Sequence, residues 1–207
     1  MTALSECRLY GIIDLGYVRR CDAARVAGQM IEGGVDVIQL RGKNKSMDEL
    51  AEVSAELHEL TAKCSTPLIV NDHAEIARCV PVDGVHVGQD DDSIQLARQK
   101  TARHVLVGKS THSLEQARAA QAEGADYIGF GPIFATPTKP DYPPIGLENI
   151  KRVHAELNLP IFCIGGITID NLQSVIGAGA KRVVMVSALL NAHSIVDYAR
   201  CATDMLA

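Results

Sequence analysis

The sequence predicts a single (β/α)8 barrel that spans residues 1–207, and three observations support this fold class. Short apolar runs alternate with longer helix-period segments along the chain and make eight strand–helix units. The short runs are apolar over most of their length, which is typical of parallel strands covered by helices. Polar residues gather directly after these runs, and in a barrel all eight such strand ends lie on the face that carries the active site.

The expected elements follow in order along the chain. Strands are expected at residues 9–13, 35–40, 67–70, 84–87, 105–108, 127–130, 161–164 and 182–186. Helices are expected at residues 22–32, 46–63, 74–79, 93–98, 113–123, 147–157, 170–176 and 195–206. A doubly wound open sheet is the alternative, but it would usually show a glycine-rich phosphate turn after the first strand, and residues 14–17 do not form one. No linker, charge block or low-complexity tract divides the chain into domains.

Particular residues mark where these elements begin and end. Gly34, Gly124 and Gly179 each close a helix before a strand, because glycine adopts the left-handed conformation that ends a helix. Pro67 and Pro160 mark the same kind of junction, since proline cannot continue a helix. Capping-box patterns open two further helices, at Ser46 with Glu49 and at Ser113 with Gln116.

Composition limits the classes of function that fit the chain. The formal net charge is −5, so no overall positive field would attract nucleic acid or a membrane surface. The six cysteines form no C-x-x-C pair. We therefore expect them to be small, buried hydrophobic residues of a protein in the reducing cytoplasm. The N-terminus lacks a basic segment followed by an apolar stretch, so we expect no secretory signal. The apolar runs are too short to span a bilayer. We expect a cytoplasmic enzyme with small-molecule substrates. The sequence leaves open whether the protein forms a homo-oligomer.

The second expected strand ends in a basic cluster that could hold an anion. Arg41 and Lys43 are two residues apart, so in an extended chain they point the same way, and Gln39 joins them. If Leu40 faces the helices, Gln39 faces the barrel interior, where a buried amide needs hydrogen-bond partners. A strand end with solvated charges is the alternative interpretation. The active-site logic of barrels favours a functional role.

Carboxylates follow the third and fourth expected strands. Asp72 could serve as the N-cap of the next helix, and the run Asp90-Asp91-Asp92 could be a solvated loop. Taken together, however, these residues place carboxylates on two adjacent strand ends opposite a basic pair. That arrangement suits a diphosphate bridged by Mg²⁺, which takes few protein ligands and keeps several waters.

Two further features lie at strand ends or within strands. Gly165-Gly166 follows the seventh strand, at a position where barrels commonly bind phosphate on backbone N–H groups, although a tight turn would also explain it. His86 lies within the fourth strand, where a satisfied interior histidine and a substrate contact are equally plausible. Tyr127 and Met185 are expected in the core.

These residues resemble those of the thiamine phosphate synthase family, from Tyr10 to about Leu190. Seven motifs carry the resemblance and occur in order at strand ends. They are Gln39-Leu40-Arg41-Gly42-Lys43, Asn71-Asp72, residues 83–91, residues 108–112, residues 129–139, Gly165-Gly166-Ile167 and Val186-Ser187-Ala188.

The resemblance implies a role for each matching residue. The groups that would bind the pyrimidine diphosphate are Gln39, Leu40, Arg41, Gly42, Lys43, Asn71, Ser110 and Lys139. Those that would bind the thiazole phosphate are Thr136, Pro137, Thr138, Gly166, Val186 and Ser187. Asp72 and Asp91 would bind Mg²⁺. The residues expected to act in catalysis are Arg41, Lys43, Lys139 and Ser110.

The resemblance also implies the reaction. The pyrimidinylmethyl diphosphate would ionise, assisted by the ring amino group, while Mg²⁺ and the basic side chains stabilise the departing diphosphate. The thiazole nitrogen would then attack the cation and give thiamine phosphate, with a carboxylated thiazole as an open alternative. Two other functions remain, a thiazole tautomerase and a non-catalytic barrel that binds thiamine phosphates. The tautomerase would need neither the diphosphate-binding cations nor the Mg²⁺ carboxylates.

Overall fold

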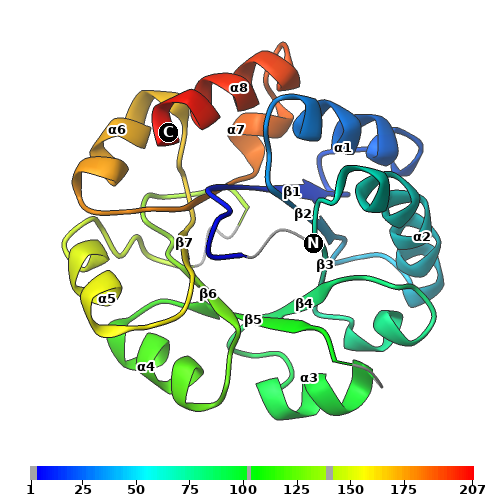
Figure 1. The fold of residues 1–207 in the computed structure, drawn as a ribbon, viewed down its shortest axis with the longest axis horizontal. Coiled ribbons are helices and arrows are strands. Elements are labelled where there is room, and N and C mark those ends of the chain that lie inside the picture. Colours follow the sequence, from blue (N-terminus) through cyan, green and yellow to red (C-terminus); the bar gives the residue numbers. More distant parts are fainter. Residues whose placement is uncertain (1–3, 102–103, 139–141) are drawn as a thin grey trace.

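The computed structural model describes residues 4–101, 104–138 and 142–207, and these form a closed parallel barrel with the strand order β1-β2-β3-β4-β5-β6-β7-β8. The strands are β1 (Leu9–Asp14), β2 (Val37–Arg41), β3 (Leu68–Asn71), β4 (Gly84–Val87), β5 (Leu106–Thr111), β6 (Tyr127–Phe130), β7 (Ile161–Cys163) and β8 (Val183–Met185). Figure 1 shows helices as a ring outside these strands. The predicted (β/α)8 fold is therefore confirmed.

The outer layer consists of helices and two 3-10 segments. The helices are α1 (Ala23–Glu32), α2 (Met47–Cys64), α3 (Ile94–Thr101), α4 (Leu114–Ala122), α5 (Ile150–Glu156), α6 (Ile169–Gly177), α7 (Ser187–Leu190) and α8 (Ile195–Leu206), and the 3-10 segments are η1 (Arg20–Asp22) and η2 (Ala74–Arg78). No helix within the described residues is long and apolar enough to cross a membrane.

The helix-ending glycines adopt the predicted conformation. Gly34, Gly124 and Gly179 have φ values of +96°, +87° and +103°, in the left-handed region. Both predicted N-caps also accept a backbone hydrogen bond three residues on, with a length of 3.2 Å for Ser46 and for Ser113.

Several boundaries differ from the prediction. Strand β5 continues to Thr111 because Lys109, Ser110 and Thr111 pair with β6, although their polarity suggested a loop. Asp72 does not cap η2, since His73 occupies the N-cap position and Asp72 itself has a left-handed φ of +63°. Helix α5 begins at Ile150 and not at residue 147, and the four-residue helix α7 was not expected.

The cysteines correct another expectation. Cys7 and Cys163 are buried, and burial raises the pKa of these thiols to about 11 and about 12. The remaining four are exposed, namely Cys21, Cys64, Cys79 and Cys201. The buried pair stays protonated at neutral pH and packs as small apolar groups.

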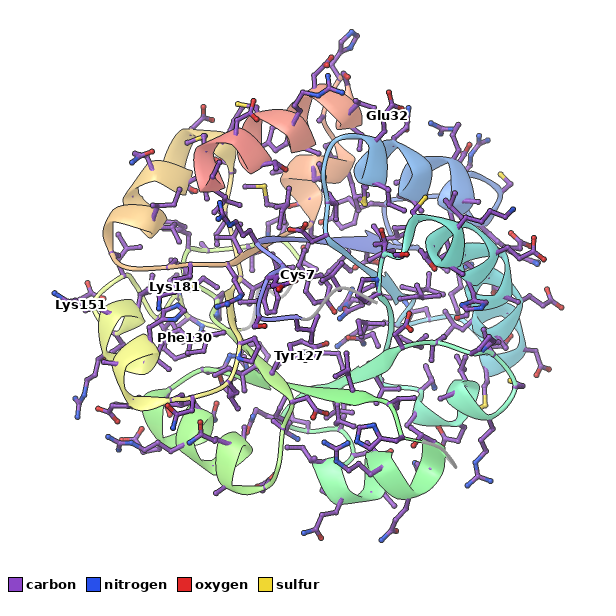
Figure 2. All side chains as sticks on the ribbon, viewed as in Figure 1. Cys7, Glu32, Tyr127, Phe130, Lys151 and Lys181 are labelled. Carbon is purple, nitrogen blue, oxygen red and sulfur yellow. The ribbon has the colours of Figure 1, made fainter. Side chains whose placement is uncertain are left out.

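Two apolar layers separate the inside of the barrel from its helical shell. The outer layer joins strands to helices and includes Phe130, whereas the interior layer includes Tyr10, Tyr127 and Phe162. Figure 2 shows Tyr127 toward the centre of the barrel and Phe130 on the side of α5. Leu4 and Cys7 precede β1 and pack on this interior layer, so the N-terminal segment covers the end of the barrel opposite the strand C-termini.

A histidine in the helical shell is half-buried, away from the strand C-termini. His154 in α5 has no hydrogen-bond partner for its Nε2 atom among the described residues. Burial lowers the pKa of this imidazole to about 4, and the positive charges of Lys181 and Arg182 lower it further. His154 is consequently neutral at physiological pH.

Candidate active site

A deep pocket opens at the C-terminal ends of the strands, where the sequence placed the active site. It encloses about 1020 Å³ of empty space including its mouth, at the upper end of the range for small-molecule sites. Nine of the predicted site residues line it, namely Gln39, Arg41, Asn71, Ser110, Thr136, Thr138, Gly166, Val186 and Ser187. These residues come from β2, β3, β5, the loop after β6, the loop after β7 and the start of α7.

The other predicted site residues lie elsewhere. Leu40 is fully buried on the helix-facing side of β2, and Gly42 is buried at the strand end. Lys43 and Pro137 are exposed. None of these four lines the pocket, and neither does Asp72 or Asp91. Lys139 lies outside the described residues.

Arg41 is the pocket cation of β2, and a buried carboxylate holds it. Its guanidinium forms an ion pair with Asp14 at the end of β1. The side chains of Arg41 and Asp14 are 11% and 5% exposed, so water screens the pair little. Asp14 also accepts a 2.8 Å hydrogen bond from the Gly16 amide, which fixes its orientation. Sequence reasoning missed Asp14, although its position at a strand end was a usable signal.

Polar groups continue from the pocket into the barrel interior. Gln39 faces inward, as predicted, and is 3% exposed. Tyr10, His86 and Tyr127 line the same space, and His86 contacts the Ser110 hydroxyl. Tyr127 is buried as expected, but it also lines the pocket and its hydroxyl lies 3.1 Å from His86 Nδ1, so it does more than fill the core.

Gly108 makes room for this interior group. It pairs with His86 on one side and with Tyr127 on the other. A Cβ at Gly108 would lie 2.1 Å from Tyr127 Cζ and 2.6 Å from His86 Nδ1, closer than real atoms approach. His86 and Tyr127 are large, and Gly108 on the strand between them is small. This alternation across neighbouring strands was a signal that could have located the inner end of the pocket.

The turn after β7 is built for close backbone approach. Gly165 and Gly166 have φ values of +99° and +63°, and a Cβ on Gly166 would lie 2.6 Å from the Ala135 carbonyl oxygen. Asn171 in α6 clamps the turn, because its side chain donates to the Gly166 carbonyl and accepts from the Thr168 amide, both at 2.9 Å. The glycine turn is thus held at the pocket edge from behind.

The loop after β6 lies against this turn and forms the next part of the pocket edge. Thr138 Oγ1 is buried and has no hydrogen-bond partner among the described residues, so it is placed to bind a polar ligand. Further along the loop, the Tyr142 ring stacks on His112 at a centroid distance of 4.5 Å, and its hydroxyl donates to Asp90 at 3.1 Å. These contacts tie the loop to β5 and to the segment after β4.

Asp72 and Asp91 follow β3 and β4, which are neighbours in the barrel. The Asp72 amide donates to the His86 carbonyl at 2.8 Å, and Asp91 Oδ2 accepts from the Gly88 amide at 2.8 Å. No group of three or more acidic, histidine or cysteine side chains that could hold a metal occurs among residues 4–101, 104–138 and 142–207. Two carboxylates at adjacent strand ends suit a hard cation that retains most of its water shell.

Comparisons with known proteins agree on one family. Residues 9–189 match the family described as thiamine monophosphate synthase. The chain is 43% identical over 196 residues to a thiamine-phosphate synthase of Chloroflexus aurantiacus. The aligned part covers 94% of this chain and 90% of that relative. A thiamine-phosphate synthase of Halalkalibacterium halodurans is 40% identical over 193 residues, with 93% and 92% covered.

Solved structures resemble this chain in family at higher identity and in fold at lower identity. A thiamine phosphate pyrophosphorylase from Pyrococcus furiosus superimposes with a TM-score of 0.90 at 29% identity and covers 99% of this chain and 98% of its own. A (S)-3-O-geranylgeranylglyceryl phosphate synthase from Thermoplasma acidophilum superimposes with a TM-score of 0.74 at 17% identity, covering 100% and 98%. At that lower identity the likeness extends to the fold alone.

Proposed function

The chain belongs to the thiamine monophosphate synthase family of transferases, and from this membership we propose that its pocket joins hydroxymethylpyrimidine diphosphate to hydroxyethylthiazole phosphate. The family resemblance read from the motifs is thereby confirmed. The observation that carries the proposal is the division of the pocket into two parts. The interior offers uncharged aromatic and amide groups that suit a heterocycle, whereas the rim offers a cation, hydroxyls and a glycine turn that suit phosphates.

We assign the pyrimidine diphosphate to the side of β2, β3 and β5. Gln39 and Ser110 would hydrogen-bond this substrate from the interior, and Asn71 would do so from the rim. Arg41 would face the diphosphate as its negative charge develops. In the reaction the methylene C–O bond breaks, the electron pair leaves with the diphosphate, and the thiazole nitrogen forms the new C–N bond. No protein nucleophile is required.

We assign the thiazole phosphate to the opposite side of the pocket. Gly166 would present backbone N–H groups to the phosphate, because its lack of a side chain permits close approach. Thr138 brings a buried hydroxyl that has no partner among the described residues, and Thr136 and Ser187 line the same region. A carboxylated thiazole would be accommodated by the same groups.

We propose that Asp72 and Asp91 hold Mg²⁺ against the diphosphate. The carboxylate donor set suits this hard cation, and the carboxylates follow β3 and β4, the two strands that come after β2 in the barrel order. When bound, the ion supplies positive charge to the leaving diphosphate. Asp72→Ala or Asp91→Ala should lower kcat strongly and raise the Mg²⁺ concentration needed for half-activation. Asp90→Ala is the matched control and should leave that concentration unchanged.

The deciding experiment supplies both substrates with Mg²⁺ and measures thiamine phosphate and diphosphate together. Equimolar formation of the two products supports a synthase. Isomerisation of a thiazole precursor without diphosphate release would identify a tautomerase, and binding without turnover would identify a passive barrel. Lys139→Ala extends the test, since removal of a donor aimed at developing charge lowers kcat by about 100- to 1000-fold. Circular dichroism should confirm that this variant folds.

A cytoplasmic location and the absence of a nucleic-acid partner stay predictions from the sequence. The proposed reaction takes two small, charged molecules and gives two others, which suits an enzyme that works on freely diffusing substrates.

A further inference from the structure

Four hydrogen bonds connect five side chains in one line across the barrel interior. Gln39 Nε2 donates to the Tyr10 hydroxyl at 2.8 Å, and the hydroxyls of Tyr10 and Tyr127 lie 3.2 Å apart. The Tyr127 hydroxyl lies 3.1 Å from His86 Nδ1, and His86 Nε2 lies 3.0 Å from Ser110 Oγ. The line starts on β2 and ends on β5, at a hydroxyl that lines the pocket.

The first bond sets the direction of all the others. An amide NH₂ can donate but not accept, so the Tyr10 oxygen is an acceptor there and its own proton must go elsewhere. Among the described contacts of Tyr10, the remaining acceptor is the Tyr127 oxygen. Tyr127 must then donate to His86 Nδ1, which leaves the proton of a neutral imidazole on Nε2. His86 consequently donates to Ser110 Oγ, and the Ser110 proton is directed away from His86.

Burial keeps the two phenols protonated, as this direction requires. Tyr10 and Tyr127 are 2% and 1% exposed. Burial raises the pKa of both phenols far above neutral pH, so neither becomes a phenolate under physiological conditions. The ring of Tyr127 packs edge-on to Phe162 at a centroid distance of 5.8 Å, and it fills the space that Gly108 leaves open. The donors and acceptors therefore have little freedom to rearrange.

We propose that Tyr10, Tyr127 and His86 are positioning residues that hold Ser110 as a hydrogen-bond donor toward the pocket, for an anionic oxygen of the bound diphosphate. The ligand in this statement rests on the proposed function, whereas the direction of the line does not. Gln39 thereby acts on Ser110 through three intervening side chains. If His86 Nε2 carried no proton, it would accept the hydrogen bond of the Ser110 hydroxyl, and Ser110 would no longer donate toward the pocket.

The ring nitrogens of His86 report the direction of the line without any substrate. Two-bond ¹H–¹⁵N correlation spectra of histidine-labelled protein distinguish the tautomers, and His86→Gln identifies the His86 signals. We expect a single Nε2–H tautomer at pH 8. Ser110→Ala should retain it, because the direction is set upstream, whereas Tyr127→Phe should give averaged nitrogen shifts. Gln39→Glu turns the first donor into an acceptor and should reverse the line to an Nδ1–H tautomer.

Three spectroscopic results would overturn the proposal. They are an Nδ1–H tautomer in the unaltered protein, loss of the Nε2–H tautomer in Ser110→Ala but not in Tyr127→Phe, and retention of it in Gln39→Glu. Failure of the protein to make thiamine phosphate would sink the proposed function and leave the spectra standing.

A double-mutant cycle tests whether Tyr127 acts through Ser110. Each of Ser110→Ala and Tyr127→Phe should lower kcat/KM by about 10- to 100-fold, as expected for one hydrogen bond to a charged group. The double variant should lose no more than the larger single loss, because both changes remove the same donation. Multiplicative losses would show that Tyr127 does not work through Ser110.

Discussion

Replacing Asp14 by alanine should destabilise the barrel and also weaken the proposed diphosphate site. Asp14 is almost fully buried and pairs with Arg41, whose side chain is 11% exposed. Removing one partner of a buried ion pair leaves the other charge uncompensated and costs about 3–5 kcal/mol. The acceptor for the Gly16 amide is lost as well. Since Arg41 reaches the pocket, we place the expected loss of unfolding free energy near the lower figure, at about 3 kcal/mol.

Urea denaturation followed by circular dichroism measures this loss, and Asp22→Ala provides the matched control. Asp22 pairs with Arg19 and Arg25 on the surface, where water screens the charges, so its removal should leave the midpoint within experimental error. Asp14→Asn keeps the shape and an acceptor and should fall between the two. In the coupling assay Asp14→Asn should lower kcat, because Arg41 would lose the ion pair that holds it at the pocket, where we propose that the diphosphate binds. An Asp14→Ala midpoint equal to that of Asp22→Ala would refute the reasoning.

Three further predictions follow from particular contacts. Gly108→Ala should abolish activity and lower Tm, because its Cβ would lie 2.1 Å from Tyr127 Cζ, whereas Gly177→Ala has open space and should unfold like the parent in the same thermal scan. Asn171→Ala should raise KM for the thiazole phosphate more than it lowers kcat in steady-state assays, since it clamps the Gly166 turn and touches no reacting atom. Half-buried His154, with its pKa lowered to about 4, should make the free energy of unfolding fall by about 1–2 kcal/mol as pH drops from 6.5 to 4, after allowance for its partial exposure. The sign follows because the unfolded chain binds the extra proton in that range, and His154→Gln should flatten this part of the stability curve.

The periodicity of the sequence located every strand of the barrel, because parallel strands covered by helices are apolar over most of their length. It failed where polar residues belong to a strand. Lys109, Ser110 and Thr111 suggested a loop, yet they continue β5 because they pair with β6 and their polar side chains find partners there or in the neighbouring loops. Thr111, for example, is 1% exposed and donates to the Gly129 carbonyl at 2.9 Å. Helix α7 was missed because four residues are too few to show a period.

Sequence reasoning located the rim of the pocket better than its interior. Rim residues such as Arg41, Asn71 and Gly166 stand at strand ends, which the fold alone marks as functional. Tyr10 and Tyr127 lie within strands, and a buried tyrosine in an apolar run has the appearance of core. Their hydroxyls acquire a role from partners on other strands, and the sequence does not show which strands will bring those partners within 3.2 Å.

The interior line explains why this small barrel keeps polar side chains where most barrels pack aliphatic ones. The hydroxyls of Tyr10, Tyr127 and Ser110 and both ring nitrogens of His86 have partners in the line, so their burial costs little. The end opposite the pocket is covered by Leu4 and Cys7, so the line lies between an apolar floor and the pocket. A donor at the end of such a line is already oriented before substrate arrives, which is the condition under which a hydrogen bond favours the transition state without reorganisation at the moment of reaction. Loosening the packing of Leu4 and Cys7 should therefore disturb the tautomer of His86, which the same ¹H–¹⁵N spectra would record.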